Sequence, residues 1–177
     1  MKRGNKFLSI LTRYLILILV GILGLGVFYF VFTPITIYPV YFLFNIFFHT
    51  VLSGNILFVK QFPIEVVGAC VAGSAYYLFF ILNLSTPNIK LKQRLNMLGF
   101  SFILFLVINI LRIFFLGLLF IAGSSWFNFT HKVFWYLISV VFVIGIWFLQ
   151  VKLFKIKDMP FYSDLKEIYS ASIFKKY

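Results

Sequence analysis

Charge and cysteine are both scarce in this chain. Charged residues make up 11% of its 177 positions and hydrophobic residues 63%, whereas soluble domains are only about half apolar. A large water-soluble domain is therefore excluded, and we expect residues 1–177 to form a single integral membrane domain. The single cysteine, Cys70, excludes an internal disulfide and a zinc site built on paired cysteines. We expect neither a metal nor another cofactor.

The positions of the basic residues argue against nucleic acid as a partner. The formal net charge is +12, but most of the lysines and arginines lie between and beyond the apolar runs. Basic residues in such positions orient membrane segments. Membrane lipids are therefore expected as partners, and nucleic acid is not.

Four apolar runs are each long enough to cross a bilayer, which takes about 20 residues. They cover residues 14–32, 66–84, 95–122 and 132–151. The first run follows a basic lead, as in a secretory signal, but it is too long and no small-x-small cleavage site follows it. We therefore expect a retained anchor and, overall, an all-α, polytopic membrane bundle of about four transmembrane helices.

The segment 38–59 has two possible placements. It is apolar but interrupted by polar residues, so it either crosses the membrane or lies in the interface. Basic residues crowd positions 90–94 and fill the tail 152–177, and both should share the cytoplasmic side with the basic amino terminus. The number of crossings before position 90 must then be even. We therefore expect 38–59 to be an interfacial or re-entrant segment on the outer face of the cell membrane, with both termini cytoplasmic.

This topology brings three chemically capable side chains toward the outer face. Cys70 lies near the outer start of the second run, and His131 lies at the outer start of the fourth. Arg112 lies about 25 Å up a hydrocarbon core of roughly 30 Å, because the third run rises from the inner side. These groups suit cysteine acyl transfer, in which a thiolate attacks a carbonyl, an imidazole moves protons and a cation stabilises the oxyanion or the thiolate.

Each of these residues also has a structural interpretation. A cysteine in an apolar helix usually acts as a small hydrophobe, and a histidine beside Lys132 fits the interface. Arg112 is harder to explain, because a charge within an apolar helix costs roughly 2.5–3.5 kcal/mol, a cost that snorkelling would lower. Asn109 shares a helix face with Arg112 and is a candidate to orient it.

Three short sequence elements follow one another in the order Cys, Arg, His. An alanine-cysteine pair with a glycine shortly after it lies in residues 69–74. An Asn-x-x-Arg-Ile element occupies residues 109–113, and an isolated histidine opens the last run in residues 129–131. This ordered set, within residues 61–148, resembles the archaeosortase/exosortase family of membrane-embedded cysteine transpeptidases, in particular the short archaeal members called pacearchaeosortases.

The resemblance implies a catalytic set with supporting residues around it. The catalytic residues would be Cys70, Arg112 and His131, with Asn109, Gly73 and Ser74 in support. Many relatives have Cys-Ser-Gly or Cys-Thr-Gly, whereas Val71 and Ala72 separate the cysteine from the glycine in this chain. A hydroxyl beside the cysteine is therefore missing, and Ser74 is the nearest substitute.

The same resemblance implies the kind of substrate. Family members cut surface proteins near a carboxy-terminal tail made of a short motif, a transmembrane stretch and a basic end. Cleavage through a thioester acyl-enzyme then passes the new end to an acceptor. Packing between the tail helix and the bundle would supply much of the recognition.

A non-enzymatic membrane protein is the alternative hypothesis. A small transporter subunit or a lipid-binding scaffold would use Arg112 to bind an anionic group and would contain an inert thiol. A transporter more often shows paired repeats or helices broken at mid-membrane, and the sequence shows neither pattern.

Overall fold

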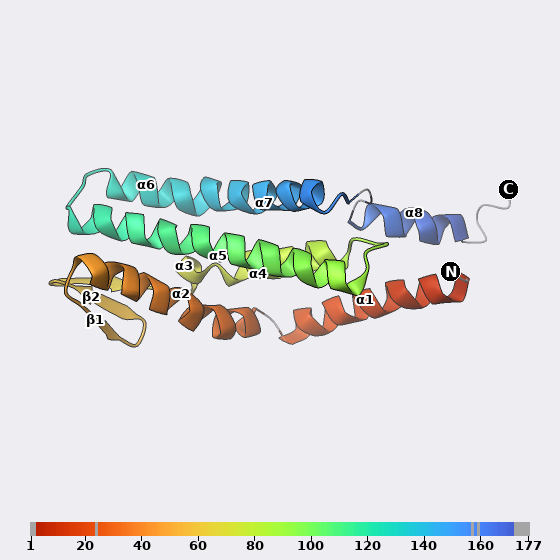
Figure 1. Cartoon of the computed structure of the whole chain (residues 1–177), viewed down its shortest axis with the longest axis horizontal. Helices are drawn as coiled ribbons and strands as arrows, with labels where there is room; N and C mark the ends of the chain where they lie inside the picture. The colour runs from red at the N-terminus through yellow and green to blue at the C-terminus, as the bar shows by residue number, and fades with distance from the viewer. Residues whose placement is uncertain (1–2, 24, 157, 159, 172–177) are drawn as a thin grey trace.

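Helices form most of the molecule (Figure 1). The computed structural model describes residues 3–23, 25–156, 158 and 160–171. The helical elements of this part are α1 (Arg3–Leu23), α2 (Gly26–Phe47), α3 (Gly68–Val71), α4 (Gly73–Leu84), α5 (Leu91–Ile121), α6 (Phe127–Val133), the π-helical turn η1 (Phe134–Ile138), α7 (Ser139–Leu153) and α8 (Tyr162–Ala171). Three strands form an antiparallel sheet in the order β1 (Thr50–Ser53), β2 (Ile56–Val59) and β3 (Phe62–Glu65).

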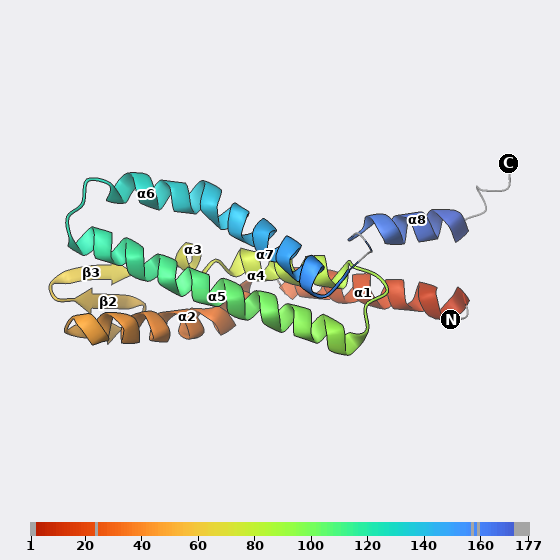
Figure 2. The ribbon, with the colours of Figure 1, turned by 45° about the horizontal axis from the view of Figure 1, so that its top comes forward.

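The helices run back and forth along one long axis. α1 and α2 follow each other end to end, α3 and α4 return beside them, α5 runs the other way, and α6 to α7 form the last rod (Figures 1 and 2). The sheet lies at one end of the molecule, while α1 and α8 lie at the other. The segment that leaves the sheet through α3 therefore starts close to the end of α5 and the start of α6.

Two helices, α2 and α5, are long and apolar enough to cross a membrane by length and composition. The rod from α6 to α7 is a third candidate if its two parts, bent by 44°, count as one span. The expected runs 95–122 and 132–151 correspond to α5 and to this bent rod, while 66–84 is divided between α3 and the 12-residue α4. The helical, membrane-protein character expected from the composition is thus present.

The expected first span at 14–32 is wrong in its bounds. α1 ends at Leu23 and α2 begins at Gly26, so the candidate span is α2 and not the run before it. Glycine weakens helices, and Gly21, Gly24 and Gly26 fall close together at this point. α2 in turn continues through two prolines, which are tolerated in apolar helices when neighbouring helices pack against them.

The segment 38–59 also differs from its expected form, and the expectation of an all-α fold is corrected with it. Residues 38–47 form the second half of α2, and the remainder enters the sheet. The polar residues at positions 53–55 do not interrupt a helix, because they make the tight turn between β1 and β2. Gly54 has φ +58° as the first residue of this two-residue turn, a conformation that glycine adopts without steric cost.

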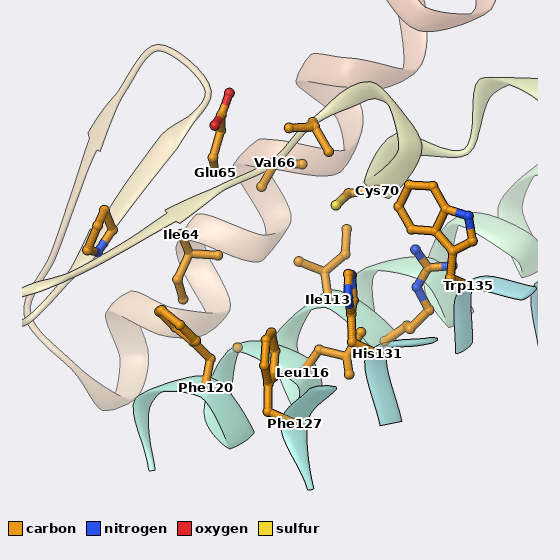
Figure 3. Close-up of a pocket in the computed structure, with 14 residues that line it drawn as sticks. Ile64, Glu65, Val66, Cys70, Ile113, Leu116, Phe120, Phe127, His131 and Trp135 are labelled. Atoms are coloured by element: carbon orange, nitrogen blue, oxygen red, sulfur yellow. The ribbon is translucent and has the colours of Figure 1, made fainter. Parts of the chain in front are cut away.

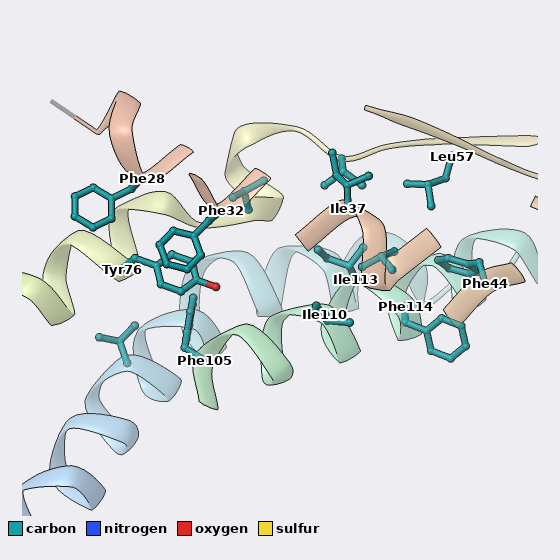
Figure 4. Packing of buried hydrophobic residues seen from close by; sticks show 14 of the residues in the cluster. Phe28, Phe32, Ile37, Phe44, Leu57, Tyr76, Phe105, Ile110, Ile113 and Phe114 are labelled. Atoms are coloured by element: carbon teal, nitrogen blue, oxygen red, sulfur yellow. The ribbon is translucent and has the colours of Figure 1, made fainter. Parts of the chain in front are cut away.

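Aromatic side chains fill the core between α2, α4 and α5 (Figure 4). Phe32 and Tyr76 stack with ring centroids 3.5 Å apart, and Phe105 meets Tyr76 edge-on at 5.2 Å. Each such pair adds about 0.5–1.5 kcal/mol beyond its buried area. Nearer the sheet, a Cβ at Gly117 would lie 2.5 Å from the ring of Phe44, so this glycine allows α2 and α5 to pack closely.

Polar contacts tie the other end of the bundle together. Arg94, buried at the start of α5, donates hydrogen bonds to the backbone oxygens of Asn83 and Thr86. Arg13 of α1 pairs with Asp164 of α8 at 2.7 Å. The amino-terminal helix, the connection before α5 and the carboxy-terminal helix thus share one end of the molecule. Of the basic residues used to predict this arrangement, Lys2, Lys157, Lys175 and Lys176 lie outside the described residues.

Candidate active site

One pocket of about 260 Å³ near the sheet is lined by Cys70, Arg112 and His131 together. The three residues come from α3, α5 and α6, which are separate elements in the sequence. Residues 63–67 of β3 and the segment after it line one side of the pocket. In Figure 3 the Cys70 sulfur faces the space in front of His131 and Trp135. The structure therefore brings together the three residues singled out from the sequence.

The position of Cys70 is set by two changes of backbone direction. The chain leaves β3 in an extended conformation at Val67 and forms only the four-residue helix α3. Ala72 then adopts a left-handed conformation, with φ 57°, and separates α3 from α4. In a single straight helix over residues 66–84, the cysteine would lie on the side of a continuous rod. The break instead leaves it half-buried at the rim of the pocket.

Asn109 fixes α3 to α5. Its side-chain amide donates to the backbone oxygen of Cys70 at 2.8 Å and to that of Val71 at 3.4 Å. Asn109 was a candidate to orient Arg112, but the hydrogen bonds of the described residues connect it to α3 instead. Its role is therefore to hold the segment that carries the thiol.

Arg112 is almost completely buried, with 7% of its surface exposed. Its Nη1 donates to the hydroxyl of Ser139 at 2.8 Å, and that hydroxyl donates to the backbone oxygen of Phe134 at 2.7 Å. The Nε of Arg112 is buried without a hydrogen-bond partner among the described residues. A buried guanidinium with an unused donor can stabilise negative charge on an incoming group.

His131 is held by aromatic neighbours. Its ring stacks on Phe127 at 5.6 Å between centroids and meets Trp135 edge-on at 5.9 Å. The π-helical turn η1 follows directly, and such turns are frequent at functional sites. Among the described residues, no hydrogen bond joins the side chains of Cys70, Arg112 and His131. They meet only as walls of one pocket, which leaves room for a reacting group between them.

Gly73 and Ser74 lie beside this pocket and do not line it. Gly73 is buried against the ring of Tyr29. Ser74 is exposed and lines a second cavity of about 590 Å³ between α4 and α7. Arg112 and Trp135 line both cavities, so the two spaces adjoin at these side chains. Ser74 is therefore placed beside the neighbouring cavity and away from the thiol's pocket.

The close contact at Gly73 gives a testable prediction. A Cβ there would lie 2.8 Å from the Tyr29 ring, so we expect Gly73→Ala to displace either the ring or the start of α4. A loss of about 1–3 kcal/mol in stability is expected from such overpacking. Thermal unfolding in detergent measures the loss.

Gly99→Ala is the matched control, because a Cβ at that helical glycine meets nothing within 4 Å. It should leave the unfolding temperature unchanged or raise it slightly, since alanine is the better helix former. Equal unfolding temperatures for the two variants would contradict the close contact at Gly73.

Three residues of this site were not found from the sequence. Trp135 and Ser139 follow His131 at intervals of four, a helical spacing that would have placed them on the same face as the histidine. Glu65 is the acidic residue of the pocket lining, and the strand that carries it was not expected. The helical spacing could have indicated Trp135 and Ser139, whereas the sequence has no comparable signal for Glu65.

Comparison with protein-family models, with curated proteins and with solved structures gives no match for this chain. Within the described residues, no three His, Cys, Asp or Glu side chains gather where they could hold a metal ion. The chemistry of the site must therefore be argued from the geometry of its own side chains.

Proposed function

We propose that this chain is a membrane-embedded cysteine transpeptidase or protease of the archaeosortase/exosortase type. It cleaves a carboxy-terminal sorting signal of surface proteins and transfers the new end to an acceptor. One observation carries the proposal: a half-buried thiol, a buried guanidinium with an unused donor and an imidazole line a single pocket. These groups suit cysteine acyl transfer, as nucleophile, oxyanion stabiliser and proton carrier.

Each group has a separate part in the proposed reaction. The Cys70 sulfur, after giving its proton to His131, forms a bond to the scissile carbonyl carbon. The carbon–nitrogen bond then breaks, and the amine leaves with the proton that His131 returns. An acceptor amine or water attacks the resulting thioester, gives its proton to His131 and releases the thiolate. Arg112 stabilises the oxyanion of both tetrahedral states.

The burial of Arg112 supports this assignment. A charge inside an apolar helix costs roughly 2.5–3.5 kcal/mol, and a single hydroxyl is a modest partner for it. The guanidinium lines the pocket, where the low local dielectric strengthens its interaction with a group that enters. The cost of burying the charge is then offset during the reaction.

The proposed membrane arrangement has four crossings. The rods α2, α3–α4, α5 and α6–α7 would each cross once, with the sheet and the pocket at the outer face and both termini cytoplasmic. The tail helix of the substrate would lie beside the bundle and present its scissile bond at the outer leaflet. This arrangement suits a protein whose polar, reactive side chains gather at one end of an apolar bundle.

The test is the rate at which Cys70 reacts with a membrane-impermeant alkylating reagent in sealed cells at pH 7. We expect labelling from outside, and we expect His131→Ala to slow it about tenfold, the effect of losing about 1.4 kcal/mol of thiolate stabilisation. Lys132→Ala, an exposed neighbour in the same helix, is the matched control and should label like the parent chain.

A denatured sample shows whether slow labelling reflects occlusion. If the folded, accessible thiol is labelled at the rate of an ordinary cysteine and His131→Ala does not change that rate, the enzyme hypothesis is wrong. A lipid-binding scaffold or a transporter subunit would then be the better hypothesis.

A further inference from the structure

Among the described residues, β3 is an edge strand with one side of its backbone unpaired. The sheet order is β1, β2, β3, so β2 pairs with only one edge of β3. Figure 2 shows β3 as the strand nearest to α5 and α6. Residues 63–67, which include the end of this strand, line the pocket that contains Cys70. The free edge therefore belongs to the pocket.

The pairing register identifies which backbone groups face the free edge. The Val66 amide donates to the Asn55 oxygen at 2.9 Å, and Glu65 is paired in register with Ile56. Residues that exchange hydrogen bonds alternate along an antiparallel pair, so Ile64 and Val66 face β2. The N–H and C=O of Glu65 and the C=O of Pro63 face the opposite side. Pro63 fits this pattern, because a proline is tolerated where its missing N–H would point away from the ladder.

The Glu65 side chain does not occupy the pocket. In Figure 3 its carboxylate points away from the cavity, whereas Ile64 points toward it. The pocket therefore meets this residue through its backbone. Unpaired backbone groups at a strand edge are a template for a further strand.

We infer that an extended stretch of the substrate, just before the scissile bond, pairs with the free edge of β3 through the backbone of Glu65 and is thereby led to Cys70. This inference rests on the proposed function and specifies how that site recognises its substrate. Backbone pairing provides affinity without regard to sequence, while side-chain pockets read every second residue.

The adjoining cavities give the direction of the bound peptide. β3 runs toward α3, and the second cavity continues past Arg112 and Trp135 between α4 and α7. That cavity has small side chains on one wall, Ala72 and Ala75, which allow close approach of a helix. The apolar tail after the scissile bond lies along this cavity, so the segment before the bond runs parallel to β3.

Parallel pairing predicts which amides of the substrate are hydrogen-bonded. The C=O groups of Pro63 and Glu65 accept hydrogen bonds from two substrate amides that are two residues apart, and the amide between them points away. Blocking alternate amides of a bound peptide should therefore have alternating effects. A peptide that is bound only by its side chains would not show this pattern.

The first experiment uses the parent chain and a thiol-reactive peptide. The probe is an acetylated pentapeptide of mixed sequence with a carboxy-terminal vinyl sulfone, to which the Cys70 thiol adds across the double bond. We expect it to react faster than methyl vinyl sulfone. A single N-methyl group, moved along the peptide amides, should slow the reaction about tenfold at alternate positions and have little effect between them.

The second experiment changes the edge itself. Glu65→Pro removes the free N–H and should slow the peptide probe about tenfold, while methyl vinyl sulfone reacts as before. Leu52→Pro is the matched control, because by the same alternation its N–H faces the remote edge of β1. It should leave both rates within about twofold of the parent chain.

The outcomes separate the two proposals. If N-methyl groups act equally at every position, or if the peptide reacts no faster than the small probe, pairing with β3 is overturned, although His131-dependent labelling would still support the enzyme. If Cys70 reacts with both probes as an ordinary thiol, the proposed function fails and the pairing fails with it. The N-methyl series decides the question even if Glu65→Pro does not fold.

Discussion

A chain in which Cys70 is replaced by alanine is expected to leave its surface-protein substrates uncut. Loss of the proposed nucleophile would remove the acyl-enzyme, so activity should fall by at least about 10³-fold. Cys70→Ser should fail almost as completely, because a hydroxyl is a far weaker nucleophile than a thiolate at neutral pH. The measurement is the mass of surface proteins that end in an apolar stretch and basic residues, in cells that carry either variant.

The structure indicates that this substitution is mild for the fold. Cys70 is half-buried on a four-residue helix, and its backbone oxygen, which holds the contact to Asn109, is kept in the variant. Ser125→Ala, in the exposed turn between α5 and α6, serves as the control for a small side-chain change near this end. Normal cleavage by the Cys70→Ala chain would exclude Cys70 as the nucleophile.

Replacement of Arg112 by methionine is expected to lower activity without lowering stability. Methionine has a similar length but no charge, so activity should fall about 10²–10³-fold with the loss of oxyanion stabilisation. The unfolding temperature should stay the same or rise, because burying a methionine avoids the desolvation cost of the guanidinium. Cleavage rates and thermal unfolding in detergent, measured on the same preparations, test both parts.

Two further variants distinguish charge from geometry at this position. Arg112→Lys retains the charge but lacks the planar set of donors, so it should recover only a small part of the activity. Ser139→Ala removes the acceptor at 2.8 Å and should reduce activity less than loss of the arginine does. If Arg112→Met unfolds readily while its remaining folded fraction cleaves normally, Arg112 is structural.

The sequence predicted the meeting of the reactive residues better than the elements that carry them. Parity of the crossings placed Cys70, Arg112 and His131 toward one face, and these residues do line one pocket. That prediction needed only the order of the apolar runs and the distribution of basic residues. Errors of a few residues in the helix bounds do not change the predicted side of these residues as long as the number of crossings is unchanged.

The sequence could not reveal the sheet or the break at Ala72. The hydropathy of residues 50–65 does not distinguish strands from helices, because short strands and buried helices have similar composition. A left-handed alanine carries no sequence signal, since glycine is the usual residue there. The contact between Asn109 and α3 likewise depends on tertiary packing, which the spacing to Arg112 cannot indicate.

The hydrogen bond between Asn109 and the Cys70 carbonyl joins residues 39 positions apart in the sequence, and this separation has a consequence during synthesis. At about 5–20 residues per second, the ribosome adds Asn109 some 2–8 seconds after Cys70, and Arg112 and His131 come later still. Until α5 has inserted, α3 lacks its anchor and the thiol lacks both partners. The proposed active site is thus incomplete while the apolar segments of the chain itself pass through the insertion machinery.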